Sequence, residues 1–219
     1  MCCSSLYSQI VHLIKASRNG EAADQMTRQG IVYNMNYGVS LYTIKKHATD
    51  IGKDHTVAQQ LWRENIRETK LFALYLFDAS RFTKDDFHRI ILSLENTEMA
   101  EQAAFTVLGD GEISQNTIMG WCQNELQLVK LAAYNTIIRK LKIGKLPEFD
   151  FGLFFEMLEQ EIAKDSTLPI KSISFALSEI ARKGNKTLVE EFLKKIERIN
   201  TKQCQNIVSI TKYELEYIN

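Results

Sequence analysis

Three clusters of basic side chains are the residues of this chain best suited to bind an anion. They are Lys45, Lys46 and His47; Arg139, Lys140, Lys142 and Lys145 in the stretch IIRKLKIGK; and Arg182, Lys183 and Lys186 around Gly184. Lysine and arginine neutralise phosphate groups, so such clusters can follow a nucleic-acid backbone. Each cluster also lies near the C-terminus of a predicted helix, where a cation offsets the helix dipole. The residues alone leave these two interpretations evenly balanced.

The segment between Arg89 and Lys130 has the opposite charge. It contains no basic residue, and its acidic residues are Glu95, Glu98, Glu101, Asp110, Glu112 and Glu125. A surface with this charge repels a phosphate backbone. The simplest interpretation is a solvated acidic face, on which Glu98 and Glu101 favour the N-terminal turn of a helix.

Motifs for metal, nucleotide or nucleophile chemistry are absent from the sequence. The histidines His12, His47, His55 and His88 have no i, i+4 pairing, and the cysteines form no CxxC pair. The stretch GDGE at 109–112 lacks the further ligands of a calcium loop, and no phosphate-binding loop or nucleophile elbow occurs. We therefore predict no metal site and no cofactor. The cysteines fit reduced thiols in a cytoplasmic protein.

Composition indicates a folded chain with no large net charge. Of the 219 residues, 45% are hydrophobic and 25% are charged, and the net charge is zero. Zero net charge lowers the expectation of nucleic-acid binding without removing it, because a basic surface can be local. No stretch approaches the ~20 apolar residues of a membrane span, so we predict no membrane contact.

The periodicity of apolar residues predicts an all-α protein. Only two prolines occur, and no alternating strand pattern appears. About thirteen helices follow from the spacing of polar N-terminal residues and helix-ending glycines. The predicted N-terminal residues are Ser40, Asp54, Thr83 with Asp86 in a capping box, Thr97, Asn124 and Asp150, with Pro169 in a first turn. The apolar run LFALYLF at 71–77 is predicted to be a buried helix.

Helices of this length with short turns can form a bundle or a stack of pairs. Helical pairs recur about every 35–45 residues, which is typical of HEAT-like arrays. We predict one helical-repeat domain over residues 1–219. The rhythm of the helices does not by itself distinguish the array from a bundle.

Residues 35–77 carry a family resemblance. The stretches YGVSLYTIKKHA and AQQLWRENIRETKLFALYLF resemble the DNA alkylation repair family, the AlkD-type alkylpurine DNA glycosylases. The similar rhythm continues through NELQLVKLAAYNTIIRKL and IKSISFALSEIARKG, so the resemblance covers about residues 20–200. It implies a right-handed α-α superhelix of HEAT-like helical pairs that holds duplex DNA on its concave surface.

The resemblance also implies a chemistry. Active members hydrolyse the N-glycosidic bond of alkylated purines, and a carboxylate stabilises the oxocarbenium-like sugar. Glu101 corresponds to that carboxylate, Thr97 and Phe175 to two sugar-packing tryptophans, and Lys130 to a phosphate-binding arginine. None of the four is the family's own residue, and lysine lacks the two-pronged phosphate contact of arginine.

Two functions follow as hypotheses. In the first, the chain binds duplex DNA, Glu101 and Phe175 are the catalytic residues, and phosphates contact Lys45, Lys46, Lys130, Arg139, Lys140, Lys142, Arg182 and Lys183. In the second, the chain is a catalytically inactive scaffold that binds a protein partner or a DNA structure. The first is the main hypothesis, and the substituted positions, the acidic middle segment and the zero net charge motivate the second.

Overall fold

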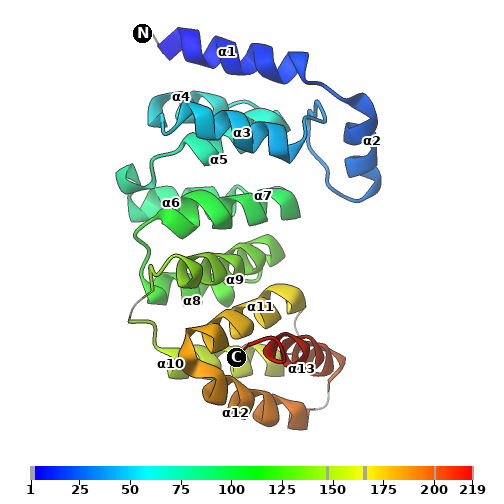
Figure 1. Ribbon diagram of the computed structural model, residues 1–219, viewed down its shortest axis with the longest axis vertical. Coiled ribbons are helices and arrows are strands. Elements are labelled where there is room, and N and C mark those ends of the chain that lie inside the picture. The colour runs from blue at the N-terminus through cyan, green and yellow to red at the C-terminus, as the bar shows by residue number, and fades with distance from the viewer. Residues whose placement is uncertain (1–2, 147, 165–166, 200, 219) are drawn as a thin grey trace. The chain divides into compact units, whose positions relative to one another are not determined.

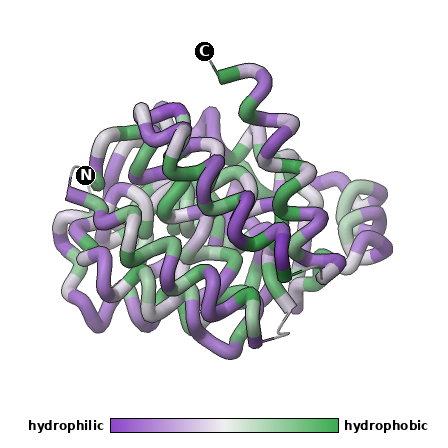
Figure 2. Tube along the Cα trace, turned by 90° about the horizontal axis from the view of Figure 1, so that it is seen from below, coloured by the Kyte–Doolittle hydropathy of each residue, from purple (hydrophilic) through white to green (hydrophobic). Residues whose placement is uncertain are grey.

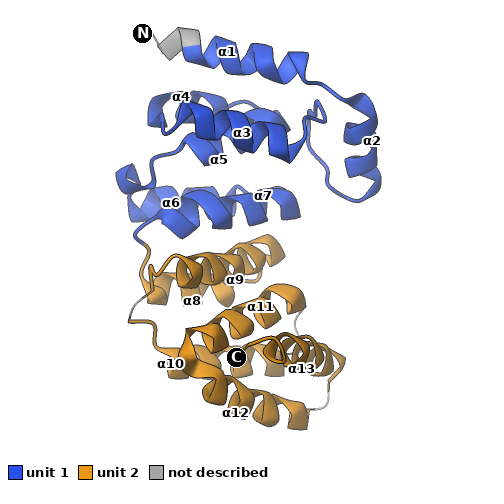
Figure 3. Cartoon of the chain, in the orientation of Figure 1, with its two compact units in different colours: residues 1–112 blue, residues 113–219 orange. Residues whose placement is uncertain are grey.

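The structure, a computed structural model, describes residues 3–146, 148–164, 167–199 and 201–218, and every regular element in these ranges is helical. Figure 1 shows short helices that follow one another in successive pairs. The all-α prediction is therefore confirmed. The chain divides into two compact units, residues 1–112 and 113–219 (Figure 3). A single domain over residues 1–219 remains a prediction.

The first unit has two layers of helices. Helix α1 packs on α4, α3 packs on α5, and α5 packs on both α4 and α7. We call α3, α5 and α7 the second row of this unit, because α5 packs between the other two. The elements are α1 (Cys3–Ala16), α2 (Gly20–Arg28), α3 (Leu41–Ile51), α4 (His55–Trp62), α5 (Arg67–Leu76), η1 (Ala79–Arg81), α6 (Lys84–Leu92), α7 (Thr97–Ala103) and η2 (Ala104–Leu108).

The second unit repeats this organisation. Helix α11 packs on both α9 and α13, so these three form its second row, and α8 packs on α9. Helix α10 contacts α12 through stacked rings of Phe155 and Phe192, whose centroids are 4.9 Å apart. The elements are α8 (Gln115–Cys122), α9 (Gln127–Lys142), α10 (Phe151–Ala163), α11 (Ile170–Ile180), η3 (Ala181–Asn185), α12 (Lys186–Ile196), η4 (Glu197–Ile199) and α13 (Lys202–Leu215).

Burial follows the amphipathic pattern of the helices. Hydrophobic and hydrophilic residues are interspersed along the helical turns seen in Figure 2, as expected for helices with one buried face. Helix α5 departs from this pattern, because its residues 71–74 and 76 are all fully buried. Helices α9 and α11 are also buried over most of their length. The burial of α5 confirms that the apolar run at 71–77 is a helix enclosed by its neighbours.

Polar caps set most helix starts where the sequence predicts them. The side chains of Ser40, Asp54 and Asp150 accept the backbone N–H three residues on, and Thr83 forms the capping box with Asp86.

Helix α7 begins at Thr97 as predicted, with Asn96 as its cap. Two other predicted starts were wrong. Helix α9 begins at Gln127, because Asn124 bonds the N–H of Leu126 and closes the preceding turn instead. Pro169 precedes the first turn of α11 instead of lying in it.

The Tyr-Gly pair at 37–38 has a steric explanation. The N–H of Asn19 donates to the Tyr37 carbonyl at 2.7 Å, so the two segments run in direct contact. Gly38 has φ +70°, and a Cβ there would lie 1.9 Å from the Asn19 carbonyl oxygen. Only glycine fits this position, because it tolerates a positive φ and needs no room for a side chain. The pair thus fixes the entry to α3.

Candidate functional site

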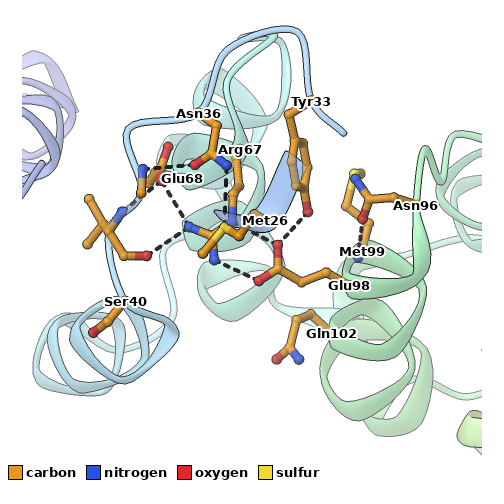
Figure 4. A network of polar contacts seen from close by, with 12 residues as sticks. Met26, Tyr33, Asn36, Ser40, Arg67, Glu68, Asn96, Glu98, Met99 and Gln102 are labelled. Carbon is orange, nitrogen blue, oxygen red and sulfur yellow. Dashed lines mark hydrogen bonds and ion pairs between the residues drawn. The ribbon is translucent and has the colours of Figure 1, made fainter. Parts of the chain in front are cut away.

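A buried arginine at the start of α5 organises the centre of the first unit (Figure 4). Arg67 has no exposed surface. Its Nε and Nη2 donate to the two oxygens of Glu98 on α7, at 2.8 and 2.6 Å. Its Nη1 donates to Glu68 at 2.9 Å and to the Val39 carbonyl at 2.8 Å. Burial alone would lower the pKa of Arg67, but the two carboxylates raise it, so this side chain stays a cation.

The same network holds the segment that leads into α3. Glu68 accepts the backbone N–H groups of Tyr37 and Val39, both at 3.1 Å. The Tyr33 hydroxyl donates to Glu98 at 2.7 Å, and burial together with the Glu98 charge raises the pKa of Tyr33. Both carboxylates are therefore fully occupied by protein donors. Their role is structural, and neither is available to a ligand.

A line of polar side chains crosses the second row of this unit. The Lys45 ammonium on α3 lies 6.0 Å from the ring centroid of Tyr75 on α5. The Tyr75 hydroxyl in turn donates to the side-chain oxygen of Gln102 on α7. Burial and the charge of Glu98 raise the pKa of Tyr75, so the phenol remains neutral. A cation, an aromatic ring and an amide therefore follow one another across the second-row helices α3, α5 and α7.

Glu101 is exposed on α7, one residue before Gln102. Partial burial and repulsion from Glu98 raise the pKa of its carboxyl. Helix α7 continues into the segment η2, which contains a kink at Thr106, and the Thr106 hydroxyl donates to the Gln102 carbonyl at 2.6 Å. Phe105 in this segment is 37% exposed.

The second row of the second unit carries a chain of ion pairs. Glu179 on α11 accepts from Arg182 at 2.6 Å and lies 3.7 Å from the Lys142 ammonium at the end of α9. Arg182 also reaches Glu214 on α13 at 3.0 Å. Phe175, 43% exposed, lies one helical turn before Glu179 on the same face. The segment η3, which breaks the helix at Lys183 and Gly184, follows α11 and presents the exposed Lys183.

Lys130 and Lys140, two of the residues predicted to contact phosphate, are buried and have a structural role instead. Lys130 is 3% exposed and pairs with Glu161, itself 1% exposed, at 2.8 Å. Burial alone would raise the pKa of Glu161, but its hydrogen bonds with Lys130 and Lys164 lower it. Lys140 is 1% exposed. Helix α9 reads as basic in the sequence, yet packing between α8 and α11 encloses these two ammonium groups, so the structure gives them a structural role.

The other predicted site residues lie at the surface. Lys45, Lys46, Lys142, Arg182 and Lys183 are exposed, and Arg139 is partly exposed. Thr97, at the position of a family tryptophan, is an exposed residue in the first turn of α7. Glu101 belongs to the first unit and Phe175 to the second. Their assignment as catalytic residues remains a prediction.

Sequence patterns did not identify the Arg67 network. The sequence predicts Glu98 on a solvated acidic face and gives Arg67 no role. The one available signal is the pair Arg67-Glu68, separated only by Thr69 and Lys70 from the apolar run at 71–77, since charges that enter a core need partners. In the parts of the chain that the structure describes, no three His, Cys, Asp or Glu residues come close enough to hold a metal. Nor is any described helix long and apolar enough to cross a membrane.

Comparison with known proteins gives two matches. Residues 10–210 match the family described as DNA alkylation repair enzyme. A solved structure described as a new family of proteins related to the HEAT-like repeat DNA glycosylases, with affinity for branched DNA structures, is similar in fold with a TM-score of 0.73. The identity is 18%, over 86% of this chain and 82% of that chain, and the likeness confirms the predicted HEAT-like repeats. No curated protein matches the sequence.

Proposed function

Since the chain belongs to the DNA alkylation repair family, we propose that it binds DNA through the second-row helices of its two units. The match over residues 10–210 carries this proposal. The protein with the similar structure is described as having affinity for branched DNA, and we extend that preference to this chain. A branched substrate offers phosphates in several directions, which suits cations that are spread over several helices.

The exposed cations of the second rows supply the phosphate contacts. In the first unit they are Lys45 and Lys46, with the ring of Tyr75 beside Lys45. In the second they are Lys142, Arg182 and Lys183. Arg182 and Lys142 already neutralise Glu179, so part of their positive charge is balanced within the protein. We therefore expect moderate affinity with a strong dependence on salt.

The double substitution Lys45→Glu with Lys46→Glu tests the interface in the first unit. We expect weaker binding to a fluorescent four-way junction and a salt slope, log Kd against log salt, reduced by about 2, since two phosphate contacts are lost. Anisotropy titrations from about 50 mM to about 200 mM salt measure both quantities. A linear duplex of the same sequence should bind more weakly than the junction.

Lys194 and Lys195 on α12 provide the matched control. They are also adjacent exposed lysines, but they lie outside the second row. Their double replacement by glutamate changes the net charge equally and should leave junction affinity within about twofold, apart from the long-range effect of charge. Equal losses for the two double variants would contradict the proposed interface, as would absence of binding at low salt.

Base excision is a second candidate function, favoured by the exposed carboxylate of Glu101. On methylated duplex, we expect Glu101→Gln to lose most of the 7-methylguanine or 3-methyladenine release seen with the unmodified protein, because only the charged carboxylate stabilises a cationic sugar. Release should fall as pH drops through the raised pKa of Glu101, above the ordinary 4.5. Glu112→Gln, an exposed acid of the same unit, is the control. Equal release by both variants would reject Glu101 as the catalytic carboxylate.

The protein-partner alternative also remains a prediction. The junction experiment bears on it directly, because a scaffold that recognises only protein has no salt-sensitive affinity for DNA.

A further inference from the structure

An arginine-rimmed pocket opens in the first unit, away from the second-row residues discussed above. Its volume is about 480 Å³, and it is formed by α4, the segment around η1, and α6. None of the proposed DNA-contacting lysines lines it. Its lining residues include His55, Trp62, Arg63, Arg81, Phe82 and Arg89.

The rim of the pocket is cationic. Arg63, Arg81 and Arg89 come from three different elements, and all three are exposed. Arg89 pairs with Asp86. Among the described residues, neither Arg63 nor Arg81 forms an ion pair. The nearby carboxylates are occupied locally, since Asp86 caps α6 at Thr83 and Asp78 bonds the N–H and hydroxyl of Ser80. Two guanidinium groups therefore remain available to one anion.

Aromatic rings form part of the pocket wall. Phe82 packs edge-on against His55 at 5.4 Å and against Phe77 at 5.1 Å, and Trp62 lies 6.0 Å from Phe77. Trp62 and Phe82 are partly exposed. His55 is only 8% exposed, and its Nδ1 has no hydrogen-bond partner. A cleft with rings on one side and free guanidinium groups at its mouth can hold a flat ring and a phosphate at the same time.

We propose that this pocket binds a nucleoside monophosphate unit, with the phosphate on Arg63 and Arg81 and the base against Trp62 and Phe82. The unit is either a free mononucleotide or the phosphorylated terminal nucleotide of a DNA strand. Guanidinium groups bind phosphate through paired hydrogen bonds, and aromatic rings stack on any base. This site is separate from the second-row interface, so either can fail without the other.

Trp62 makes the proposal directly measurable. The chain has two tryptophans, so in a Trp121→Phe background the emission of Trp62 reports on the pocket. We expect dAMP to quench this emission in a saturable way. Arg63→Glu with Arg81→Glu should weaken the apparent Kd at least ~10-fold, because two charge-assisted contacts are lost. Both side chains are exposed, so the variant should fold, and circular dichroism checks that it does.

Four further titrations decide the ligand. A single strand with a 5′-phosphate that binds more tightly than dAMP, and more tightly than the same strand with a 5′-hydroxyl, identifies a DNA end as the source. The reverse order identifies a free nucleotide. Phosphotyrosine that quenches as strongly as dAMP overturns the nucleotide assignment, as does inorganic phosphate that competes as strongly as dAMP.

The control variants separate this site from the DNA interface. Lys45→Glu with Lys46→Glu should leave dAMP quenching unchanged. The proposal is overturned if dAMP does not quench Trp62 emission when Arg63 and Arg81 are unchanged. It is also overturned if the quenching survives the double arginine variant.

Discussion

Arg67→Met is expected to destabilise the first unit by about 3–5 kcal/mol, the typical cost of removing one partner from a buried ion pair. The substitution keeps a side chain of similar length but removes the charge and every donor. Glu68, which is fully buried, and Glu98, whose side chain is 13% exposed, would then share the interior without a cation. Two buried like charges cost more than the lost hydrogen bonds alone.

The loss should be confined to one unit, and the two tryptophans can report this. Trp62 lies in the first unit and Trp121 in the second, so Trp62 emission in a Trp121→Phe background follows the first unit during urea unfolding. We expect the midpoint of that transition to fall sharply. Separate signals matter here, because a chain of two units need not unfold in a single transition.

Arg89→Met is the matched control for Arg67→Met. It also removes an arginine–carboxylate pair of the first unit, but the Arg89 side chain is 76% exposed. Exposed pairs contribute at most about 1 kcal/mol, so the control should shift the midpoint little. If both variants lose the same stability, the buried network does not hold the first unit together.

Lys130→Met is expected to have an effect of similar size in the second unit. Lys130 and Glu161 are both buried, and removing the ammonium leaves Glu161 with Lys164, whose side chain is 56% exposed. We expect a loss of about 3–5 kcal/mol, followed by Trp121 emission in a Trp62→Phe background. Lys164→Met removes the exposed partner of the same carboxylate and should cost at most about 1 kcal/mol.

The double variant Lys130→Met with Glu161→Met tests the cause of that loss. If the cost of the single substitution comes from an uncompensated carboxylate, removing the carboxylate as well should restore most of the stability. A double variant no more stable than Lys130→Met would point instead to the packing of the lysine stem.

The pH dependence supplies an independent check on the same pair. The pKa of Glu161 is lowered in the folded protein, so its stabilising contribution is complete above the ordinary value of 4.5 and is lost as pH falls through the lower folded-state pKa. Without Lys130, burial instead favours the neutral carboxyl. The penalty of Lys130→Met should therefore be smaller near pH 4 than at pH 7, and a constant penalty would contradict this assignment.

Local signals in the sequence determined the helices. Apolar periodicity, capping side chains such as Ser40 and Asp54, and Gly52 at a helix end act over three or four residues, so they can be interpreted without the fold. Where two local interactions compete, the prediction failed. Asn124 closes a turn with Leu126 instead of opening α9, which begins at Gln127. The family resemblance at 35–77 likewise came from the sequence, and the match over residues 10–210 confirms it.

Only the tertiary structure decided which charges face the solvent. Lys130 and Lys142 lie on one helix and look alike in the sequence, yet one is enclosed with Glu161 and the other is exposed. Arg67 and Glu98 are 31 residues apart and meet only because α5 packs on α7. Burial and long-range pairing depend on which helices become neighbours, and the helical period is the same for a buried cation as for a solvated one. The sequence could therefore place the cations on helices, but only packing shows which of them are exposed to solvent.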